Sequence, residues 1–518
     1  MCQKLCGNQS NHDSASVKAG TSRREFLAVG ASALGAAAVS ASSTPALAAP
    51  EQGELAPEGG DASSEMPKDT GASNRRYLLK GGMVLSMDPK VGDFAQGDVL
   101  IEGKKIVAVG ARLSAPGVEV INATGMIVMP GFVDTHHHQY QTALRSFLSD
   151  GLLANDGLPH GEKNYLDYIH TKITPVFRPE DAYLAELVSS LSQLDAGVTT
   201  VVDTSQVGHS PAHTDAVIRG LQEAGRRAVF VYSPGVGPSN IFPRDLQRIR
   251  GRYFSSTDQL LTLAMGGEVF DAAFRTYWTL ARQNGLFIVT HLVGGLGQTT
   301  LVEQLASERL LGPDIEFIHA TRISEGSWQA IARSGATISI AAPIEMTMRH
   351  GLPPLQAALD HGIQPSLSVD VECTMTADFF TQMRTAFTLQ RALINERALN
   401  GETNLPPLLT CRDVIRFATV EGARVARLSH KVGSLTPGKE ADILLLRADA
   451  LNVAPINNVP GAVVTLMDRS NVDTVIVAGK IRKWRGALVD VSWAPLRARL
   501  EASRDYLLQA AGVQRVLF

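Results

Sequence analysis

The chain has 518 residues, a formal net charge of −3 and 44% hydrophobic residues, with a mean hydropathy of +0.02. These values describe a globular chain that can bury a large core. Nothing in the charge balance suggests that nucleic acid or an acidic ligand is a partner.

The first 48 residues are typical of an export signal. Residues 22–27 read SRREFL, a small apolar run follows at 28–39, and residues 46–48 form an A-x-A cleavage site. The apolar run is too short and too rich in small residues to span a bilayer, so we expect no stable membrane anchor. We predict a twin-arginine leader over 1–48 and a mature protein that is periplasmic or secreted.

Two segments of contrasting composition follow the leader. Residues 49–75 are rich in Glu, Gly, Ser, Pro and Ala and hold few large apolar side chains, so we predict a flexible linker. Residues 76–125 consist of short β-rich runs separated by turn residues, which indicates antiparallel strands.

Strand and helix patterns alternate over residues 126–429. The predicted strands are short apolar runs at 126–133, 198–203, 228–232, 260–265, 286–291, 315–319, 336–340 and 366–370. Eight such β-then-α units match a TIM-like (β/α)8 barrel of the α/β class better than a doubly wound sheet. No G-x-G-x-x-G motif follows any of these strands, which also disfavours a dinucleotide-binding fold.

The last part of the chain returns to β character at 430–493. We expect these strands to pair with those of 76–125 in a small β-sandwich built from both chain ends. Residues 494–518 carry apolar residues at helical spacing, and we predict a terminal helix that packs on the barrel or on a partner subunit of a homo-oligomer.

Four of the eight predicted strands end in residues that can bind a metal ion. The first strand leads into His136 and His138, and the fifth, sixth and eighth end in His291, His319 and Asp370. Each residue alone is more often structural. In a barrel, however, the carboxyl ends of all strands open on one face, so these side chains are expected to converge. Imidazole and carboxylate groups suit zinc and similar divalent ions, so the pattern predicts a metal site.

Several motifs are similar to those of a known family: PGFVDTHHH at 130–138, VTTVVD at 198–203, FIHA at 317–320 and GSLTPGKEADILLL at 433–446. Over about residues 77–490 the chain resembles the amidohydrolase superfamily. The resemblance is to the branch that contains cytosine deaminase, S-adenosylhomocysteine deaminases and triazine hydrolases.

This resemblance implies a set of roles. His136, His138 and His291 would bind one divalent ion together with Asp370, which would also accept a proton from the attacking water. His319 would hold that water or the substrate. Binuclear members carry a carboxylated lysine at strand four, and residues 260–268 contain no lysine, so one ion is expected. Zinc is the first expectation, with iron, cobalt and manganese as alternatives.

One departure bears on the reaction. Deaminases of this branch carry His-x-x-Glu at strand five, whereas Gly294 stands three residues after His291 here. The missing glutamate favours hydrolysis of an amide, carbamate or urea C–N bond, on an aromatic or heterocyclic compound, over ring deamination. Glu268, Glu345 and Glu372 are possible substitutes for it.

Two other functions remain open. The first is an aminohydrolase that acts on a nucleobase-like or triazine ring, and the second is a barrel that binds a small molecule without catalysis. In each case the partner is a small molecule. The predicted substrate contacts follow the first and seventh strands, and they are Gln139, Tyr140, Arg145, Glu345, Met348 and His350.

Overall fold

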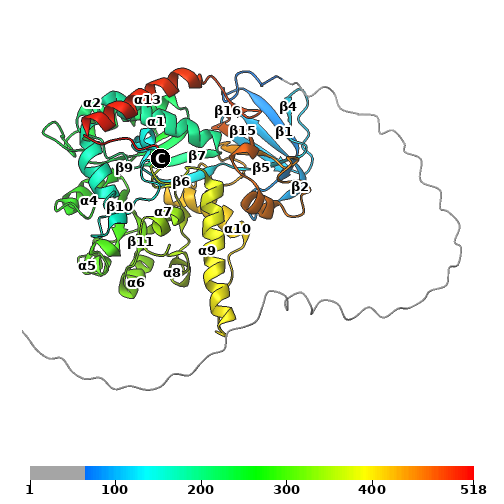
Figure 1. Ribbon diagram of the computed structural model, residues 1–518. Coiled ribbons are helices and arrows are strands. Elements are labelled where there is room, and N and C mark those ends of the chain that lie inside the picture. Colours follow the sequence, from blue (N-terminus) through cyan, green and yellow to red (C-terminus); the bar gives the residue numbers. More distant parts are fainter. Residues whose placement is uncertain (1–64) are drawn as a thin grey trace, which may run out of the picture. The chain divides into compact units, whose positions relative to one another are not determined.

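The computed structural model describes residues 65–518, in which eight parallel strands form a nearly closed barrel beside a mixed sheet (Figure 1). The predicted leader at 1–48 and the predicted linker up to residue 64 lie outside the described residues. The barrel strands, in spatial order, are β6 (Phe132–His137), β7 (Val198–Asp203), β8 (Arg227–Tyr232), β9 (Leu261–Gly266), β10 (Ile288–Val293), β11 (Ile315–Thr321), β12 (Thr337–Ile340) and β13 (Ser366–Leu367). The predicted TIM-like barrel is therefore confirmed.

The first predicted strand is divided in the structure. Met126–Pro130 forms a separate strand, β5, which pairs with β1 and β14 in the mixed sheet, and the barrel begins only at Phe132. Gly131 lies at the junction, where a Cβ atom would lie 2.2 Å from Thr199 Oγ1. The apolar run is therefore divided because Pro130-Gly131 lets the chain pass from one sheet to the other.

Backbone hydrogen bonds close the barrel between its first and last strands. The Asp370 N–H donates to the His136 carbonyl at 2.9 Å, and the His138 N–H donates to the Asp370 carbonyl at 2.7 Å. The strand β13 is short, and Asp370 pairs with His137 as an isolated bridge beyond its end. Residues at the predicted metal site thus form the seam of the barrel.

The connections between the barrel strands supply most of the helices. A representative case is α6, where the Ser324 side chain accepts from the Ser327 N–H and Gly335, with a φ of 73°, ends the helix. The helices of this part are α1 (Pro179–Asp195), α2 (Pro211–Glu223), α3 (Leu246–Tyr253), α4 (Phe274–Gln283), α5 (Leu301–Ser307), α6 (Glu325–Ser334), α7 (Ala342–Thr347), α8 (Leu355–Asp360), α9 (Phe379–Leu399), α10 (Cys411–Arg416) and α11 (Gly422–Val425).

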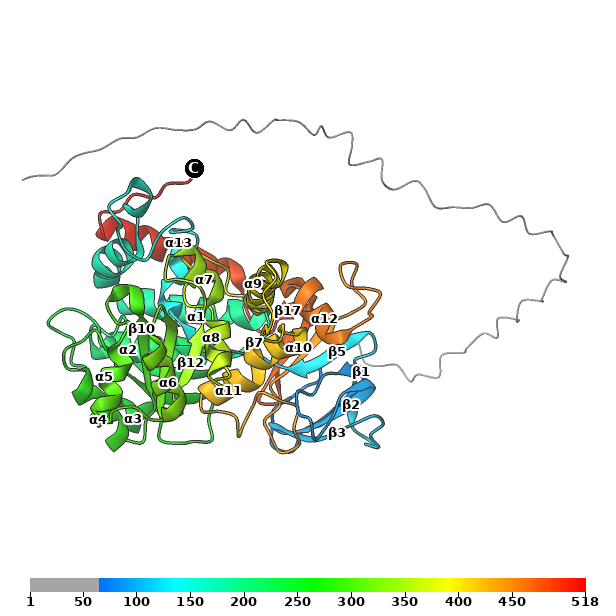
Figure 2. The same ribbon diagram turned by 90° about the horizontal axis from the view of Figure 1, so that it is seen from below.

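Shorter 3-10 and π-helical turns lie in the loops and near the end of the chain. They are η2 (Gln139–Leu144), η3 (Pro159–Gly161), η4 (Leu166–Ile173), η5 (Thr174–Val176), η6 (Gly294–Leu296), η7 (Phe417–Glu421), η8 (Ala462–Leu466) and η9 (Arg469–Asn471). Figure 2 shows α9, α10 and α12 (Val459–Gly461) between the barrel and the mixed sheet. The predicted terminal helix is α13 (Trp493–Ala510), which packs against α1.

Both chain ends build the mixed sheet, as predicted. Its strands run in the order β17-β16-β15-β14-β5-β1-β2-β3, with β4 also paired to β1, so they form one hydrogen-bonded sheet. Figure 1 shows the blue strands β1 and β2 beside the orange strands β15 and β16. The bounds are β1 (Arg76–Val84), β2 (Phe94–Glu102), β3 (Lys105–Gly110), β4 (Glu119–Asn122), β14 (Ile443–Arg447), β15 (Val472–Val477), β16 (Lys480–Trp484) and β17 (Ala487–Leu488).

Residues 65–75, the end of the predicted linker, lie against this sheet. Met66 packs on its apolar core, Pro67 is buried, and Thr70 Oγ1 accepts from the Ile481 N–H at 3.1 Å. This short stretch is therefore a packed extension of the sheet. Among the helices of residues 65–518, none combines the length and apolar content that a bilayer-spanning segment requires.

A buried ion cluster joins the mixed sheet to the amino-terminal end of the barrel. Arg227, the first residue of β8, donates to Glu440 at 2.7 Å and to Asp442 at 3.0 Å, and all three side chains are at most 5% exposed. Glu440 and Asp442 belong to the GSLTPGKEAD loop. That motif therefore has a structural role that fixes how the sheet sits on the barrel.

Candidate metal centre

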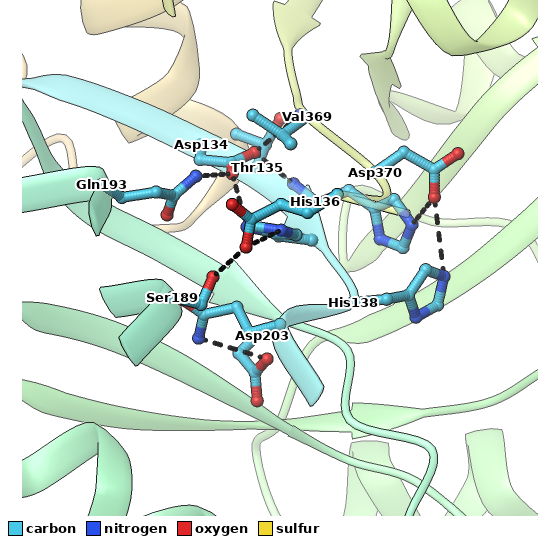
Figure 3. A network of polar contacts seen from close by, with 12 residues as sticks. Asp134, Thr135, His136, His138, Ser189, Gln193, Asp203, Val369 and Asp370 are labelled. Atoms are coloured by element: carbon cyan, nitrogen blue, oxygen red, sulfur yellow. Dashed lines mark hydrogen bonds and ion pairs between the residues drawn. The ribbon is translucent and has the colours of Figure 1, made fainter. Parts of the chain in front are cut away.

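Strand β6 brings two imidazoles to one side at its carboxyl end, as predicted. The pairing of β6 with β7 shifts by one residue between Asp134 and His137, which is a β-bulge that re-aims the side chains. His136 and His138 both point toward Asp370 (Figure 3). Their Nε2 atoms lie 3.1 Å and 3.6 Å from Asp370 Oδ1.

Four residues from three parts of the barrel come together at this point. His136, His138, His291 and Asp370 each offer one ligand atom, and these atoms all lie within 4.8 Å of one another. His291 comes from β10, and Asp370 follows β13. Three imidazole nitrogens and one carboxylate oxygen are a donor set that suits a borderline divalent ion.

The outer nitrogen of each ring is held by an oxygen atom. His138 Nδ1 donates to the Thr204 carbonyl at 2.9 Å, and His291 Nδ1 donates to Glu268 Oε1 at 2.8 Å. His136 Nδ1 lies 3.2 Å from Thr204 Oγ1. Because Nδ1 donates to an oxygen in His138 and His291, the Nε2 atom of each neutral ring keeps its lone pair toward the centre, as in metal-binding histidines.

The inner nitrogens show why a positive ion fits here. His138 Nε2 and His291 Nε2 lie 3.3 Å apart, and in neutral rings of this tautomer two lone pairs would face each other. Burial lowers the pKa of His291, but Glu268 and Asp370 raise it by more, so the surroundings favour positive charge at this point. A divalent ion would satisfy all four donors at once, which one proton cannot do.

Burial and charge also set the state of the carboxylate. Burial alone raises the pKa of Asp370, but the hydrogen bond from His136 and the nearby His319 hold it well below its usual range. Asp370 therefore remains ionised. Its φ of 67° lies in the left-handed region, which is costly for a residue with a Cβ atom and is typical of functional sites.

His319 lies beside the four candidate ligands. Its Nε2 is 3.6 Å from Asp370 Oδ2, and its Nδ1 is 3.1 Å from Glu345 Oε1. Burial lowers the pKa of His319 to about 4, so its ring is neutral at pH 7. A neutral imidazole fixed at Nδ1 presents Nε2 toward Asp370, where it can bind a water or a polar group of the substrate.

A cavity of about 570 Å³ opens over these residues. Met348 and His350, two of the predicted substrate contacts, lie in its lining. His350 is only 4% exposed, neither ring nitrogen has a hydrogen-bond partner within residues 65–518, and its ring lies 4.6 Å from that of His319. The full lining is His138, Leu153, Tyr165, Leu166, His170, Gln206, Glu268, Phe270, Asp271, His291, Val293, Leu296, His319, Met348, His350, Asp370 and Val371.

The other predicted substrate contacts are not part of that lining. Gln139 donates to Glu186 at 3.0 Å inside the barrel wall, and the Tyr140 hydroxyl lies 3.4 Å from Thr174 Oγ1. The turn η2, which follows the histidines at once, directs these side chains into the wall. Prediction from loop position alone could not foresee this turn.

Arg145 and Glu345 are also occupied elsewhere. Arg145 binds Glu372 through Nε at 2.9 Å and Nη2 at 2.7 Å, away from the cavity. Glu345 is fully buried behind His319, and its Oε1 also accepts from the Ala341 N–H at 2.9 Å. Glu345 therefore orients His319, and a direct contact with the substrate is not supported for either residue.

The three possible substitutes for the missing glutamate differ in position. Of Glu268, Glu345 and Glu372, only Glu268 lines the cavity, and both of its oxygens accept from His291. The expected position itself cannot carry a side chain in this backbone, because a Cβ atom at Gly294 would lie 2.1 Å from the Arg322 carbonyl oxygen. The backbone at this position thus requires glycine, which accounts for the glutamate missing from the sequence.

Sequence reasoning missed part of the cavity. His170, in η4, and Gln206, three residues past β7, both line it. The imidazole of His170 makes no hydrogen bond within residues 65–518, its ring packs 5.0 Å from that of Tyr165, and burial lowers its pKa to about 4. It lies more than thirty residues beyond His138 in a loop, so no strand end marks it.

Comparison with known proteins places the chain among enzymes. A family model described as "Amidohydrolase family" matches residues 127–482. A 5'-deoxyadenosine deaminase of Methanosarcina barkeri is 25% identical over 427 residues, which are 78% of this chain and 92% of that protein.

Two solved structures share the fold. One is an adenosine deaminase from Xanthomonas campestris with bound zinc, with a TM-score of 0.72 and 21% identity, and the match covers 85% of this chain and 100% of that one. The other is a mutant atrazine chlorohydrolase from Arthrobacter aurescens complexed with zinc and atraton, with a TM-score of 0.72 and 22% identity. That match covers 83% of this chain and 100% of the other.

Proposed function

Because the chain belongs to the amidohydrolase family, we propose that it is a metal-dependent hydrolase of a non-peptide C–N bond in an amide, carbamate or urea. The observation that carries the proposal is the convergence of four ligand atoms within 4.8 Å, with the outer nitrogens of the rings held by oxygen atoms. His136, His138, His291 and Asp370 would hold one divalent ion, and zinc is the proposed metal.

A bound divalent ion makes water a stronger acid and polarises the bond under attack. Asp370, which stays ionised, would accept the proton of the attacking water and pass it to the leaving nitrogen. The neutral His319, oriented by Glu345, would accept a hydrogen bond from the attacking water through Nε2 and hold it in place. His350 has free ring nitrogens in the same cavity and would donate a hydrogen bond to the substrate.

Metal analysis and substrate profiling test this proposal together. Purified protein loaded with zinc is expected to hold about one ion per chain and to cleave members of a panel of aryl amides, carbamates and ureas. Chelation should abolish the cleavage, and added zinc should restore it. A protein without a stoichiometric metal, or activity that survives chelation, would contradict the proposal.

A second candidate function is release of ammonia from a nucleobase-like or triazine ring. The presence of Glu268 in the cavity favours it, because a carboxylate there could protonate a ring nitrogen. Both oxygens of Glu268 are already bound to His291, which disfavours it. An ammonia assay on aminoheterocycles, run beside the amide panel, separates the two.

Export and oligomeric state are further proposals. We propose that the twin-arginine leader carries the protein to the periplasm and that the chain forms a homo-oligomer. Fractionation of cells that produce the native chain or Arg23→Lys/Arg24→Lys tests the first, since the double variant should remain in the cytoplasm. Light scattering of the purified protein tests the second.

A further inference from the structure

The charged side chains that line the cavity over the candidate metal centre are mostly acidic. None of the seventeen residues that line it within the described part of the chain is Lys or Arg. Three of them are acidic, namely Glu268, Asp271 and Asp370. A site that binds a carboxylate or phosphate normally supplies Arg or Lys to pair with the charge, and this one does not.

Three basic residues of the surrounding loops are engaged elsewhere. Arg145, predicted to contact the substrate, is bound to Glu372. Arg349 pairs with Asp156 at the surface. Lys163 lies over the ring of Phe147, 4.0 Å from its centre, in a different hollow of the molecule. None of these three cations can therefore enter the cavity without giving up a contact.

The formal charges of the cavity remain negative even with a metal ion bound. Three carboxylates carry three negative charges, and a divalent ion supplies two positive ones, which leaves one negative charge. The free polar groups are imidazoles: neither ring nitrogen of His350 has a hydrogen-bond partner within residues 65–518, and the His170 ring packs against that of Tyr165. Uncharged imidazoles can bind the carbonyl or amide of a neutral compound.

The walls of the cavity are apolar. Most of the remaining lining residues carry large apolar side chains, and two of these stay open to solvent at the rim: Phe270 is 53% exposed and Leu296 is 36% exposed. Large apolar side chains exposed around a concave site mark a binding surface. The walls behind them are Leu153, Leu166, Val293, Met348 and Val371.

We infer that the cavity selects uncharged substrates with a bulky apolar body and excludes those that carry a carboxylate or phosphate. This inference rests on the proposed function for the reaction, but it concerns binding and can be tested without turnover. The apolar body would lie against Leu166, Leu296 and Phe270, and the scissile group would face His319 and Asp370.

A matched pair of probes tests the inference. Acetanilide is neutral, and 4-acetamidobenzoate differs from it by one carboxylate. Binding to the purified full-length protein is measured by ligand-observed NMR, with the protein as isolated and after chelation. We expect acetanilide to bind at least about tenfold more tightly in both samples, because a carboxylate without a partner loses its hydration.

The possible outcomes separate this inference from the proposed function. Equal binding of the two probes, tighter binding of the carboxylate, or binding of neither overturns the inference. Hydrolysis is followed separately in the zinc-loaded protein. A protein that binds acetanilide selectively but cleaves nothing in the panel would retain the inference and contradict the proposed function.

A variant that adds a positive charge at the rim makes the test sharper. Leu296→Arg places a guanidinium at the rim and is expected to tighten binding of 4-acetamidobenzoate about three- to tenfold, while binding of acetanilide weakens slightly. Leu352→Arg is the matched control, since Leu352 is 63% exposed and lies outside the lining. If both variants change the binding of the two probes equally, the cavity does not set the selectivity, and the inference fails.

Discussion

The two ends of the barrel both bury ionisable side chains, but these side chains are paired differently. At the amino-terminal end, Arg227 binds the carboxylates of Glu440 and Asp442, which neutralise it within the protein. At the carboxyl-terminal end, His138 Nε2 and His291 Nε2 face each other with their outer nitrogens already bound. The charge of Arg227 is paired by protein carboxylates, whereas the converging nitrogens of the second cluster need an added cation to bind them all.

The difference shows how one fold separates stability from function. A buried ion pair that is fully formed contributes to folding mainly because removing one partner is costly. Donors that converge without a partner cost stability and are retained where they bind something. Substitutions at the two ends should therefore affect different measurements.

The largest effect is expected for His291→Ala. Loss of one ligand should remove the stoichiometric metal and lower activity by about 10³-fold or more, since metal-activated water supplies the nucleophile. Metal content by mass spectrometry and kcat/KM are the measurements. His361→Ala, at a surface ion pair with Glu325, is the control and should keep both.

The next effect concerns the other end of the barrel. Arg227→Met leaves two buried carboxylates without their partner and should lower the free energy of unfolding by about 3–5 kcal/mol. Metal content should stay at the wild-type level. Denaturation of Arg499→Met, whose exposed pair with Glu180 contributes less than about 1 kcal/mol, provides the comparison. A loss of metal in Arg227→Met would mean that the two ends are not separate.

A third prediction concerns Asp203, which lies behind the metal site (Figure 3). Burial raises its pKa to about 6, above the value of about 3.9 of an unfolded chain. A raised carboxyl pKa contributes stability fully below pH about 4, and this contribution is lost as the pH rises to about 6. Wild-type protein should therefore lose stability relative to Asp203→Asn across this window. Parallel stability curves would contradict the prediction.

The fourth prediction compares the roles of Glu268 and Glu345, the carboxylates that bind Nδ1 of His291 and of His319. Glu268→Gln weakens the support of His291, a candidate ligand, and should lower metal affinity about 10–100-fold. Glu345→Gln acts on His319, which is not one of the four, so it should lower kcat while metal affinity stays within about threefold. Competition with a chelating dye measures the affinities. Equal losses in the two variants would make His319 a ligand.

The smallest effect is expected for His170→Leu. One hydrogen bond to an uncharged substrate contributes about 0.5–1.5 kcal/mol, so KM should rise about two- to tenfold with kcat nearly unchanged. The control is His160→Leu, at an exposed residue outside the cavity. A fall in kcat with constant KM would instead assign His170 to the chemical step.

Much of the centre was predictable because parallel barrel strands bring their carboxyl ends to one face. His136, His138, His291 and Asp370 each end or follow a predicted strand, so their meeting needed no detail of the loops. The repeated β-then-α pattern likewise predicted the barrel. These features depend on periodicity, which is local in the sequence.

The remainder depends on turns that periodicity does not reveal. Pro130-Gly131 moves the chain between two sheets within one apolar run, and η2 turns Gln139 and Tyr140 into the wall. Arg145 forms an ion pair with Glu372, which lies 227 residues further along the chain. His170 enters the cavity from a loop with no marker in the sequence. Long-range pairing and loop geometry decided these positions.

The seam of the barrel has a consequence for when the metal can bind. His136 and Asp370 are 234 residues apart, and the Asp370 backbone donates to His136 and accepts from His138 in the hydrogen bonds that join the first strand to the last. Bringing them together requires closing a very long loop, which an incomplete or partly opened barrel does not achieve. A bound ion would therefore link the first and last strands across the seam. Metal would then bind only to a chain whose barrel is fully closed.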